Sequence, residues 1–127
     1  MVRWSEASEI VRKSGGLTAH PETGVSPASG FMVARPEYGV IVTATSFYDS
    51  ITGAQILSDY LTDNQGNLTS TDYLGLWHDT ARDEVAIDIA ENIQDKDEAI
   101  RAGIARNQQS IWDIINEVEI TTGGTGR

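Results

Sequence analysis

YLGLWHDTARDEVAIDIAENIQDKDEAIRAGIARNQQSIWD, residues 73–113, carries the most regular apolar pattern in the chain. In its second run, branched aliphatic residues alternate with small or polar ones, which predicts a half-buried strand over residues 84–90. The buried face of that strand is predicted to carry Val85, Ile87 and Ile89. A similar alternation over residues 73–77 and a short polar connection are typical of a β-hairpin, so the two runs are predicted to be antiparallel neighbours.

A helix is predicted directly after this hairpin. Asp95 is a typical N-cap residue, and Glu98 three residues later completes a capping-box pattern. The helix face that is predicted to be buried carries Ala99, Ile100, Gly103 and Ile104. We expect this helix to cover the buried face of strand 84–90.

The segment 110–120 fits two structures. Its apolar residues match a helical spacing, but β-branched and aromatic residues dominate it and Asn116 interrupts the run. We interpret the segment as a strand for that reason, and because of a resemblance described below. Periodicity alone leaves the helix open as an alternative.

The remaining segments complete an α+β pattern. A short N-terminal helix is predicted to end at Gly15–Gly16, and residues 17–30 are rich in turn-forming residues, which indicates an extended arm. Residues 31–34 and 40–45 are predicted to pair as a hairpin around a turn at 36–39. A helix over the following apolar positions has Ser46 or Asp49 as its candidate cap.

These elements predict one domain of 127 residues. We expect an N-terminal helix and arm at 1–29, an α+β core at 30–121 and a Gly-rich, flexible tail at 122–127. The predicted fold class is α+β: two layers, with helices packed on one face of a mostly antiparallel sheet. The other face of such a sheet is free to meet water or a partner.

Composition narrows the class of protein. The formal charge is −10, and residues 72–119 hold 12 acidic against 4 basic side chains, so direct binding to a nucleic-acid backbone is disfavoured. The acidity is typical of a solvated surface, with a basic partner or mimicry of nucleic acid as the alternative. The absence of cysteine excludes disulfides and thiolate chemistry. No apolar run reaches the roughly 20 residues of a membrane helix, and no signal peptide is evident, so we expect a cytoplasmic protein without membrane association.

Candidate binding residues come from the central segment and share aromatic or polar character. They are Tyr73, Trp77, His78, Asp88, Asn107 and Trp112. If the Trp112 strand lies beside the hairpin, its ring and those of Tyr73 and Trp77 are expected on one sheet face, as at protein interfaces. The alternative is that these rings are core residues packed under a helix. The amide of Asn107 is expected either to satisfy a strand end or to contact a ligand.

Signals for catalysis are sparse. His78 with Asp79 and Asp88 is the candidate for a metal site or a general base, against the alternative of a polar hairpin turn. Hydrolytic metal sites usually gather three or more ligands, and no nucleophile-elbow or phosphate-binding glycine motif occurs. The sequence therefore indicates no catalytic residue, no metal and no cofactor.

Short motifs distributed over most of the chain give the resemblance. They are Gly30–Ala34 after a T-G-x-x-P turn, Tyr73–Asp79 (YLGLWHD), Val85–Ile89, the D-x-x-E-A helix start at 95–99, NQQSIWD at 107–113 and EITTGG at 119–124. In these the chain resembles a group of small, functionally uncharacterised actinobacterial and actinophage proteins. The resemblance implies an accessory protein in a bacterial host cell and a strand after Asn107. It implies no catalytic residue.

Three functional hypotheses follow. The first is a non-catalytic accessory or regulatory binding protein, phage- or mobile-element-encoded, that contacts a protein partner or forms a homo-oligomer. The second is an acidic inhibitor that mimics nucleic acid. The third is a small metal-dependent hydrolase or nuclease that uses His78, Asp79 and Asp88.

Overall fold

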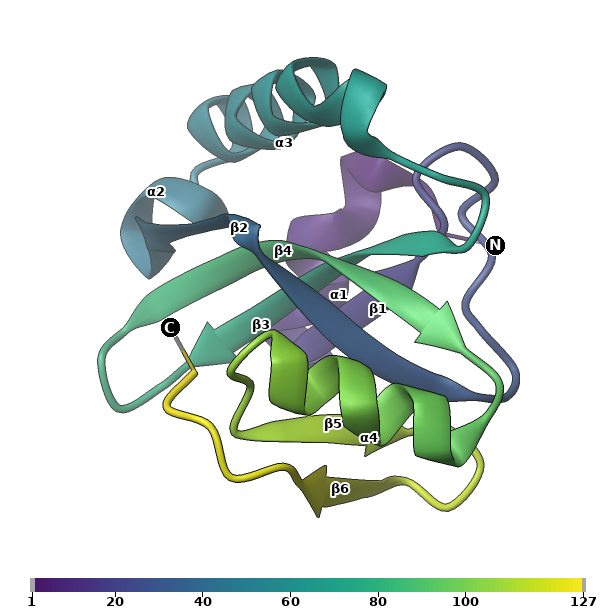
Figure 1. The fold of residues 1–127 in the computed structure, drawn as a ribbon. Helices are drawn as coiled ribbons and strands as arrows, with labels where there is room; N and C mark the ends of the chain where they lie inside the picture. The colour runs from purple at the N-terminus through teal and green to yellow at the C-terminus, as the bar shows by residue number, and fades with distance from the viewer. Residues whose placement is uncertain (1, 127) are drawn as a thin grey trace.

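The structure, a computed structural model, describes residues 2–126 and shows a curled antiparallel sheet with helices against it (Figure 1). This confirms the predicted α+β class. The helical elements are η1 (Trp4–Glu6), α1 (Ala7–Ser14), α2 (Ala44–Tyr48), α3 (Ser50–Asn64), η2 (Gln65–Asn67) and α4 (Lys96–Ala105). The strands are β1 (Gly16–Ala19), β2 (Phe31–Thr43), β3 (Asp72–Asp79), β4 (Glu84–Ile93), β5 (Ser110–Asp113) and β6 (Val118–Thr121). Their order in the sheet is β1-β3-β4-β2-β5-β6.

The predicted hairpin of β3 and β4 is confirmed. The two strands pair in register from Asp72↔Glu91 to Asp79↔Glu84. Val85, Ile87 and Ile89 are all fully buried, as the alternation predicts. Their burial fixes the register, because a slip of one residue would turn the buried residues to the opposite face.

The hairpin predicted for residues 31–34 and 40–45 is wrong. Residues 31–43 form the single long strand β2, which pairs with β4 on both sides of an irregularity between Arg35 and Val40. Arg35 pairs with Ile89 and Val40 with Ile87, so four residues of β2 stand opposite Asp88 alone. Pro36 has no N–H for the ladder and lies in this bulge, and the chain does not reverse because residues 40–43 pair with the same strand β4 as residues 31–35.

The arm predicted for residues 17–30 also contains a strand. Gly16–Ala19 forms β1, which pairs with β3 as an edge strand of the sheet. A segment of four residues is too short to give a periodic signal, so only the pairing with β3 identifies it as a strand. The predicted end of the first helix is confirmed, because Gly15 takes a left-handed conformation, φ 85°, and its N–H closes the last turn on Val11.

The helices cover one face of the sheet over two separate apolar clusters. The larger cluster joins the buried hairpin residues to α1, α2 and α3, and the smaller one joins α4 to Val33 of β2 and Ile111 of β5. The expectation that the helix after Asp95 covers Val85, Ile87 and Ile89 is therefore wrong. That helix covers β2 and β5 instead, because β4 leads directly into it at the far end of the hairpin.

The start of α4 is confirmed and its buried face is corrected. The Asp95 carboxylate accepts a hydrogen bond of 2.9 Å from the Glu98 N–H. Ala99 and Gly103 face the sheet, whereas Ile104 is 58% exposed. A Cβ on Gly103 would lie 2.8 Å from Ile111, so the absent side chain lets α4 approach β5 with residue 103 facing the sheet. The next residue, Ile104, lies about 100° further around the helix and therefore points away from the sheet.

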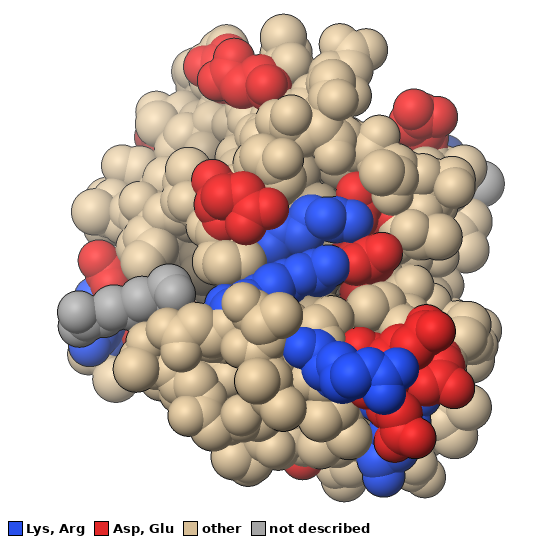
Figure 2. All heavy atoms as spheres, viewed as in Figure 1, with Lys and Arg blue, Asp and Glu red and all other residues tan. Residues whose placement is uncertain are grey.

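A row of ionic side chains separates the two clusters. Asp72 is fully buried and bonds Arg35 at 3.0 Å, while Glu91 lies 3.5 Å from Arg35 and 2.6 Å from Arg106. Burial alone would lower the pKa of Arg35, but the hydrogen bond and charge of Asp72 outweigh it and raise that pKa. Figure 2 shows basic side chains lying against acidic ones across the middle of this face, above α4.

The Gly-rich tail, expected to be flexible, lies along the segment between α4 and β5 within the described residues. Backbone N–H groups of residues 122, 124 and 126 donate to the carbonyls of Gln109, Gln108 and Asn107. The strand predicted after Asn107 is confirmed as β5 and continues through a turn into β6. Within residues 2–126, no helix has the length and apolar character needed to cross a bilayer.

Candidate functional site

The sheet face opposite the helices, which we call the open face, contains a hollow of about 210 Å³. Residues from every strand line it: Thr18 of β1, Met32 and Ala34 of β2, Gly75, Leu76 and Trp77 of β3, Asp88 and Ala90 of β4, Ser110, Ile111 and Trp112 of β5, and Glu119 of β6. We refer to it as the open-face hollow.

The curl of the sheet creates this hollow. In a flat sheet with strands about 4.8 Å apart, β1 and β6 would be separated by about 24 Å. A sphere of 210 Å³ is only about 7 Å across, yet Thr18 and Glu119 from the two edge strands both line it. The sheet must therefore bend until residues of both edge strands line one hollow. Figure 1 shows the sheet curled rather than flat.

Asp88 supplies the charge inside the open-face hollow. It pairs with Gly75 across the hairpin, and its Oδ1 atom lies only 2.6 Å from the position that a Cβ on residue 75 would take. Protein atoms enclose most of Asp88, and the remaining opening faces the hollow. Among residues 2–126, none donates a hydrogen bond or forms an ion pair to this carboxylate. Burial therefore raises the pKa of Asp88 to about 6.

Two tryptophans line the hollow on either side of Asp88, because β3 and β5 lie on opposite sides of β4 in the sheet. Trp77 on β3 is 59% exposed, and Trp112 on β5 is 40% exposed. Because side chains alternate along a strand, Trp77 points to the sheet face opposite to that of the buried Leu76, which is the open face. Trp112 pairs with Met32, and both side chains point to the open face. The alternative that these rings pack under a helix is therefore wrong for both.

The other predicted binding residues lie outside the open-face hollow. Tyr73 shares the alternation of Gly75 and Trp77, but its ring meets the His20 ring edge-on at 5.7 Å, and it does not line the hollow. Asn107 lies beyond α4 with φ 55°, where its side-chain oxygen accepts from the Thr125 N–H at 3.1 Å. Thr125 belongs to the C-terminal tail and to no strand, so this contact joins Asn107 to the tail and not to a strand end.

His78 lies on the helix-covered side of the sheet. Its Nδ1 is 2.9 Å from the Tyr48 hydroxyl, and its Nε2 is 3.2 Å from Asp83 Oδ1. Burial is the main cause that raises the pKa of Tyr48, which makes its hydroxyl a poor nucleophile. The contacts from Tyr48 through His78 to Asp83 connect α2 to the hairpin turn.

The candidate catalytic group of His78, Asp79 and Asp88 does not assemble. His78 pairs with Val85 on the helix-covered side, whereas Asp88 faces the open-face hollow. The Asp79 carboxylate accepts from the N–H groups of Ala81 and Arg82 and shapes the hairpin turn. No group of three or more His, Asp or Glu side chains within residues 2–126 is placed to hold a metal ion.

The acidic side chains of residues 72–119 do not form one ridge. Asp72 and Glu91 pair with arginines on the helix-covered side, and Asp88 faces the opposite side. Asp95 caps α4, and Asp113 bonds Asn116, which lowers the pKa of Asp113. Mimicry of nucleic acid needs charges spaced along one surface, so the arrangement gives that hypothesis no support.

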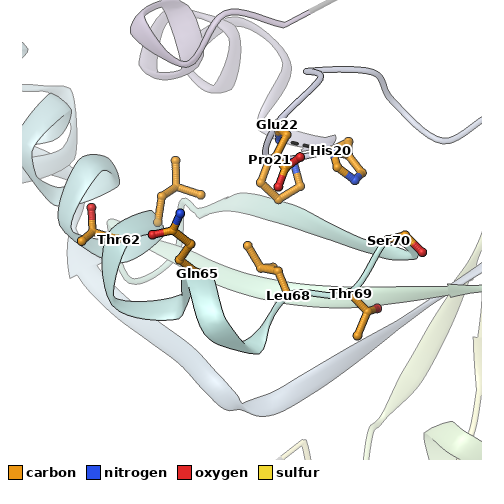
Figure 3. Close-up of a pocket in the computed structure, with 9 residues that line it drawn as sticks. His20, Pro21, Glu22, Thr62, Gln65, Leu68, Thr69 and Ser70 are labelled. Carbon is orange, nitrogen blue, oxygen red and sulfur yellow. Dashed lines mark hydrogen bonds between the residues drawn. The ribbon is translucent and has the colours of Figure 1, made fainter.

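A second hollow of about 460 Å³ lies between the turn after β1 and the end of α3 (Figure 3). Figure 3 shows His20, Pro21 and Glu22 facing Gln65 and Leu68 across it. The His20 Nδ1 atom accepts from the N–H groups of Glu22 and Thr23, and the Thr69 hydroxyl bonds Asp72. His20 and Thr69 thus have partners within the chain, and Glu22 is the one acidic side chain among the lining residues.

Several residues of the open-face hollow had no sequence signal. Thr18, Met32, Ala34, Ser110 and Glu119 reach the hollow only through the pairing of β1 with β3 and of β2 with both β4 and β5. Gly75 did carry a signal, since a glycine between Tyr73 and Trp77 in a strand indicates close approach of a neighbouring ring or backbone. The structure shows the Asp88 carboxylate in that place instead.

Comparisons of the chain with protein-family models, with curated proteins and with solved structures find no match.

Proposed function

We propose that this chain is a non-catalytic binding protein that engages a protein partner through the open face of its sheet. The observation that carries the proposal is the pair of exposed tryptophans, Trp77 and Trp112, on either side of the open-face hollow. Tryptophan is the residue type most enriched among those that dominate binding energy at protein interfaces. Apolar area gathered around one hollow marks an interaction site more often than singly scattered apolar residues do.

Charge favours a different protein over a second copy of this chain. The formal charge of the chain is −10, and Asp88 and Glu119 lie in or beside the open-face hollow. Two copies docked face to face would bring these carboxylates together, and like charges across an interface are costly. A partner with a basic surface would be attracted by these carboxylates, whereas a second copy of the chain would be repelled by them.

Binding without catalysis is supported by the position of the one candidate catalytic group in the sequence. The structure does not bring His78, Asp79 and Asp88 together, because His78 lies on the helix-covered side, Asp79 shapes the hairpin turn and Asp88 faces the open-face hollow. The expected phage or mobile-element origin rests on the sequence resemblance alone and stays a prediction.

Panning a random peptide library displayed on a carrier tests the proposal without knowledge of the natural partner. Enriched peptides are then measured by calorimetry against the native chain, Trp77→Ala and Trp112→Ala. We expect each tryptophan variant to weaken binding about tenfold or more, which is about 1.4 kcal/mol and typical of an interface anchor. The matched control is Ile51→Ala, which removes an 82% exposed apolar side chain on α3 and is expected to leave the affinity unchanged.

Two results would contradict the proposal. One is enrichment of peptides whose affinity ignores both tryptophan variants, which would place binding on another surface. The other is light scattering that shows a dimer of the native chain and a monomer of Trp77→Ala, which would make the occupant a second copy. Thermal unfolding of each variant confirms that it is folded before its affinity is interpreted.

A further inference from the structure

The structure assigns an occupant to the open-face hollow: we propose that it receives one arginine side chain of the partner, with the guanidinium against Asp88 and between Trp77 and Trp112. This inference rests on the proposed function and names the chemistry of the partner residue that enters. It goes beyond a general attraction between an acidic and a basic surface, because it places one cation at one carboxylate.

The carboxylate is positioned for a partner that the chain itself does not supply. Asp88 forms no hydrogen bond or ion pair with any residue of the described range 2–126, whereas Asp72 and Glu91 are held by arginines. A largely enclosed carboxylate without a partner is unfavourable in the free protein, and such groups are normally paired. The β2 bulge opposite Asp88 and the missing side chain of Gly75 keep the space in which it lies.

The walls of the hollow fit a planar cation. Trp77 and Trp112 are both exposed and both line the space, and tryptophan is the ring that attracts cations most strongly. A guanidinium stacks on aromatic rings and donates two parallel hydrogen bonds to a carboxylate, which an ammonium cannot do. Glu119, beside Trp112 in the β5–β6 pairing, adds a second negative charge at the rim.

A metal ion suits the hollow less well. Hard cations in proteins take six or more oxygen ligands, and the side-chain oxygens that line the open-face hollow come from Asp88, Glu119, Thr18 and Ser110. In the described part of the chain, residues 2–126, no group of three or more His, Asp or Glu side chains is placed to hold a metal ion. The aromatic borders would leave most of the coordination shell of such an ion unfilled. Apolar walls and one enclosed carboxylate instead match a side chain with an apolar stem and a charged end.

The first test uses Nα-acetyl-arginine methylamide as the probe and its citrulline counterpart as the neutral control of the same shape. Proton–nitrogen NMR spectra of the full chain report the indole N–H groups of Trp77 and Trp112 during each titration. We expect saturable shifts of both indoles with the arginine probe and none with the citrulline probe. The absence of arginine-dependent shifts up to about 50 mM, well beyond the millimolar range of such small contacts, would overturn the inference.

The second test uses variants. Asp88→Asn is expected to weaken the arginine probe at least tenfold, whereas Asp59→Asn, which removes an exposed charge on α3, is expected to leave its affinity within twofold. Equal losses in both variants would show that only net charge attracts the probe, and would overturn the specific site. Because asparagine is close to aspartate in size, the variant keeps the shape of the hollow and is expected to fold.

The outcomes separate this inference from the proposed function. In one outcome, peptide binding depends on Trp77 and Trp112 but is unchanged by Asp88→Asn and by replacement of arginine with citrulline in the peptide. That outcome would support the binding function and contradict the arginine site. Peptides that ignore both tryptophan variants would remove the proposed function itself. Loss of affinity in the tryptophan variants, in Asp88→Asn and on citrulline replacement would support both.

Discussion

Asp88 can lie flat against β3 only because residue 75 has no side chain: a Cβ on Gly75 would come within 2.6 Å of Asp88 Oδ1. The two residues face each other across the hairpin. Among residues 2–126, Asp88 has the only carboxylate enclosed in the open-face hollow, and the glycine at position 75 fixes where that carboxylate lies. The relationship also separates two kinds of tight glycine in this fold. At Gly75 the obstacle is the end of a side chain, whereas at Gly53 it is the backbone carbonyl of Phe47.

Gly53→Ala is expected to destabilise the protein by about 2–4 kcal/mol, although alanine usually stabilises a helix by about 1 kcal/mol relative to glycine. The Cβ would stand 2.0 Å from the Phe47 carbonyl oxygen, and backbone there can move only by separating α2 from α3. Gly75→Ala, the comparison variant, is expected to change stability by less than about 1 kcal/mol, since the Asp88 carboxylate can rotate toward the hollow. Urea unfolding measures both. A smaller loss for Gly53→Ala than for Gly75→Ala would contradict the contacts described.

Asp88→Asn is expected to stabilise the protein at pH 8 and to have little effect near pH 4. Burial raises the pKa of Asp88 to about 6, so the folded state holds this proton more tightly than the unfolded chain does. The unfavourable contribution of Asp88 therefore grows as the pH rises from about 4 to about 6 and is complete above that range. Its size at pH 8 is about 1–3 kcal/mol, at 1.36 kcal/mol for each pKa unit.

Unfolding of both proteins in urea at a series of pH values measures this difference. Other titratable groups near Asp88 are Glu119 at the rim of the hollow and Tyr60, whose pKa is raised mainly by burial and further by the charge of Asp88. Neither replaces the effect of Asp88, so Asp59→Asn serves as the control with the same charge change at an exposed site. A constant difference across the whole pH range would refute the titration of Asp88 as its source.

Arg35→Met is expected to cost about 3 kcal/mol, because it leaves the fully buried Asp72 carboxylate without its cation. Asp72 keeps only the hydrogen bonds from the N–H and hydroxyl of Thr69. Adding Asp72→Asn to that variant is expected to restore part of the loss, which a double-mutant cycle by urea unfolding measures. Lys13→Met removes an exposed cation paired with Glu9, and its expected cost is below about 0.5 kcal/mol. Costs of similar size at both positions would show that Asp72 is adequately solvated without Arg35.

Gly124→Ala is expected to detach the C-terminal tail from the segment between α4 and β5. A Cβ at this position would stand 2.4 Å from the Asn107 backbone, and Asn107 is fixed in a left-handed conformation at the end of α4. Amide hydrogen exchange is the measurement: protection of the Gly124 and Gly126 N–H groups, which bond Gln108 and Asn107, should fall about tenfold or more. The control is Gly66→Ala, where no heavy atom lies within 4 Å, and tail protection should be unchanged. Tail amides that exchange rapidly in the native chain would contradict the hydrogen bonds themselves.

The sequence by itself determined the elements whose signals are local. Alternation identified β3 and β4 and the burial of Val85, Ile87 and Ile89, because a period of two has one meaning for a half-buried strand. The Asp95 cap and the Gly15 stop were equally readable, since each acts through hydrogen bonds within one turn of chain. Alternation also placed Trp77 and Asp88 on the face opposite the buried aliphatic residues.

Only the tertiary structure decided which segments meet. The pairing of β2 with both β4 and β5, and the curl that brings Thr18 and Glu119 to one hollow, depend on contacts between residues far apart in the chain. A local pattern states which side of a strand is apolar but not which strand lies beside it, nor how far the sheet bends. For the same reason Pro36 suggested a turn where packing made a bulge, and the pattern of α4 could not show that Gly103 would face the sheet and Ile104 the solvent.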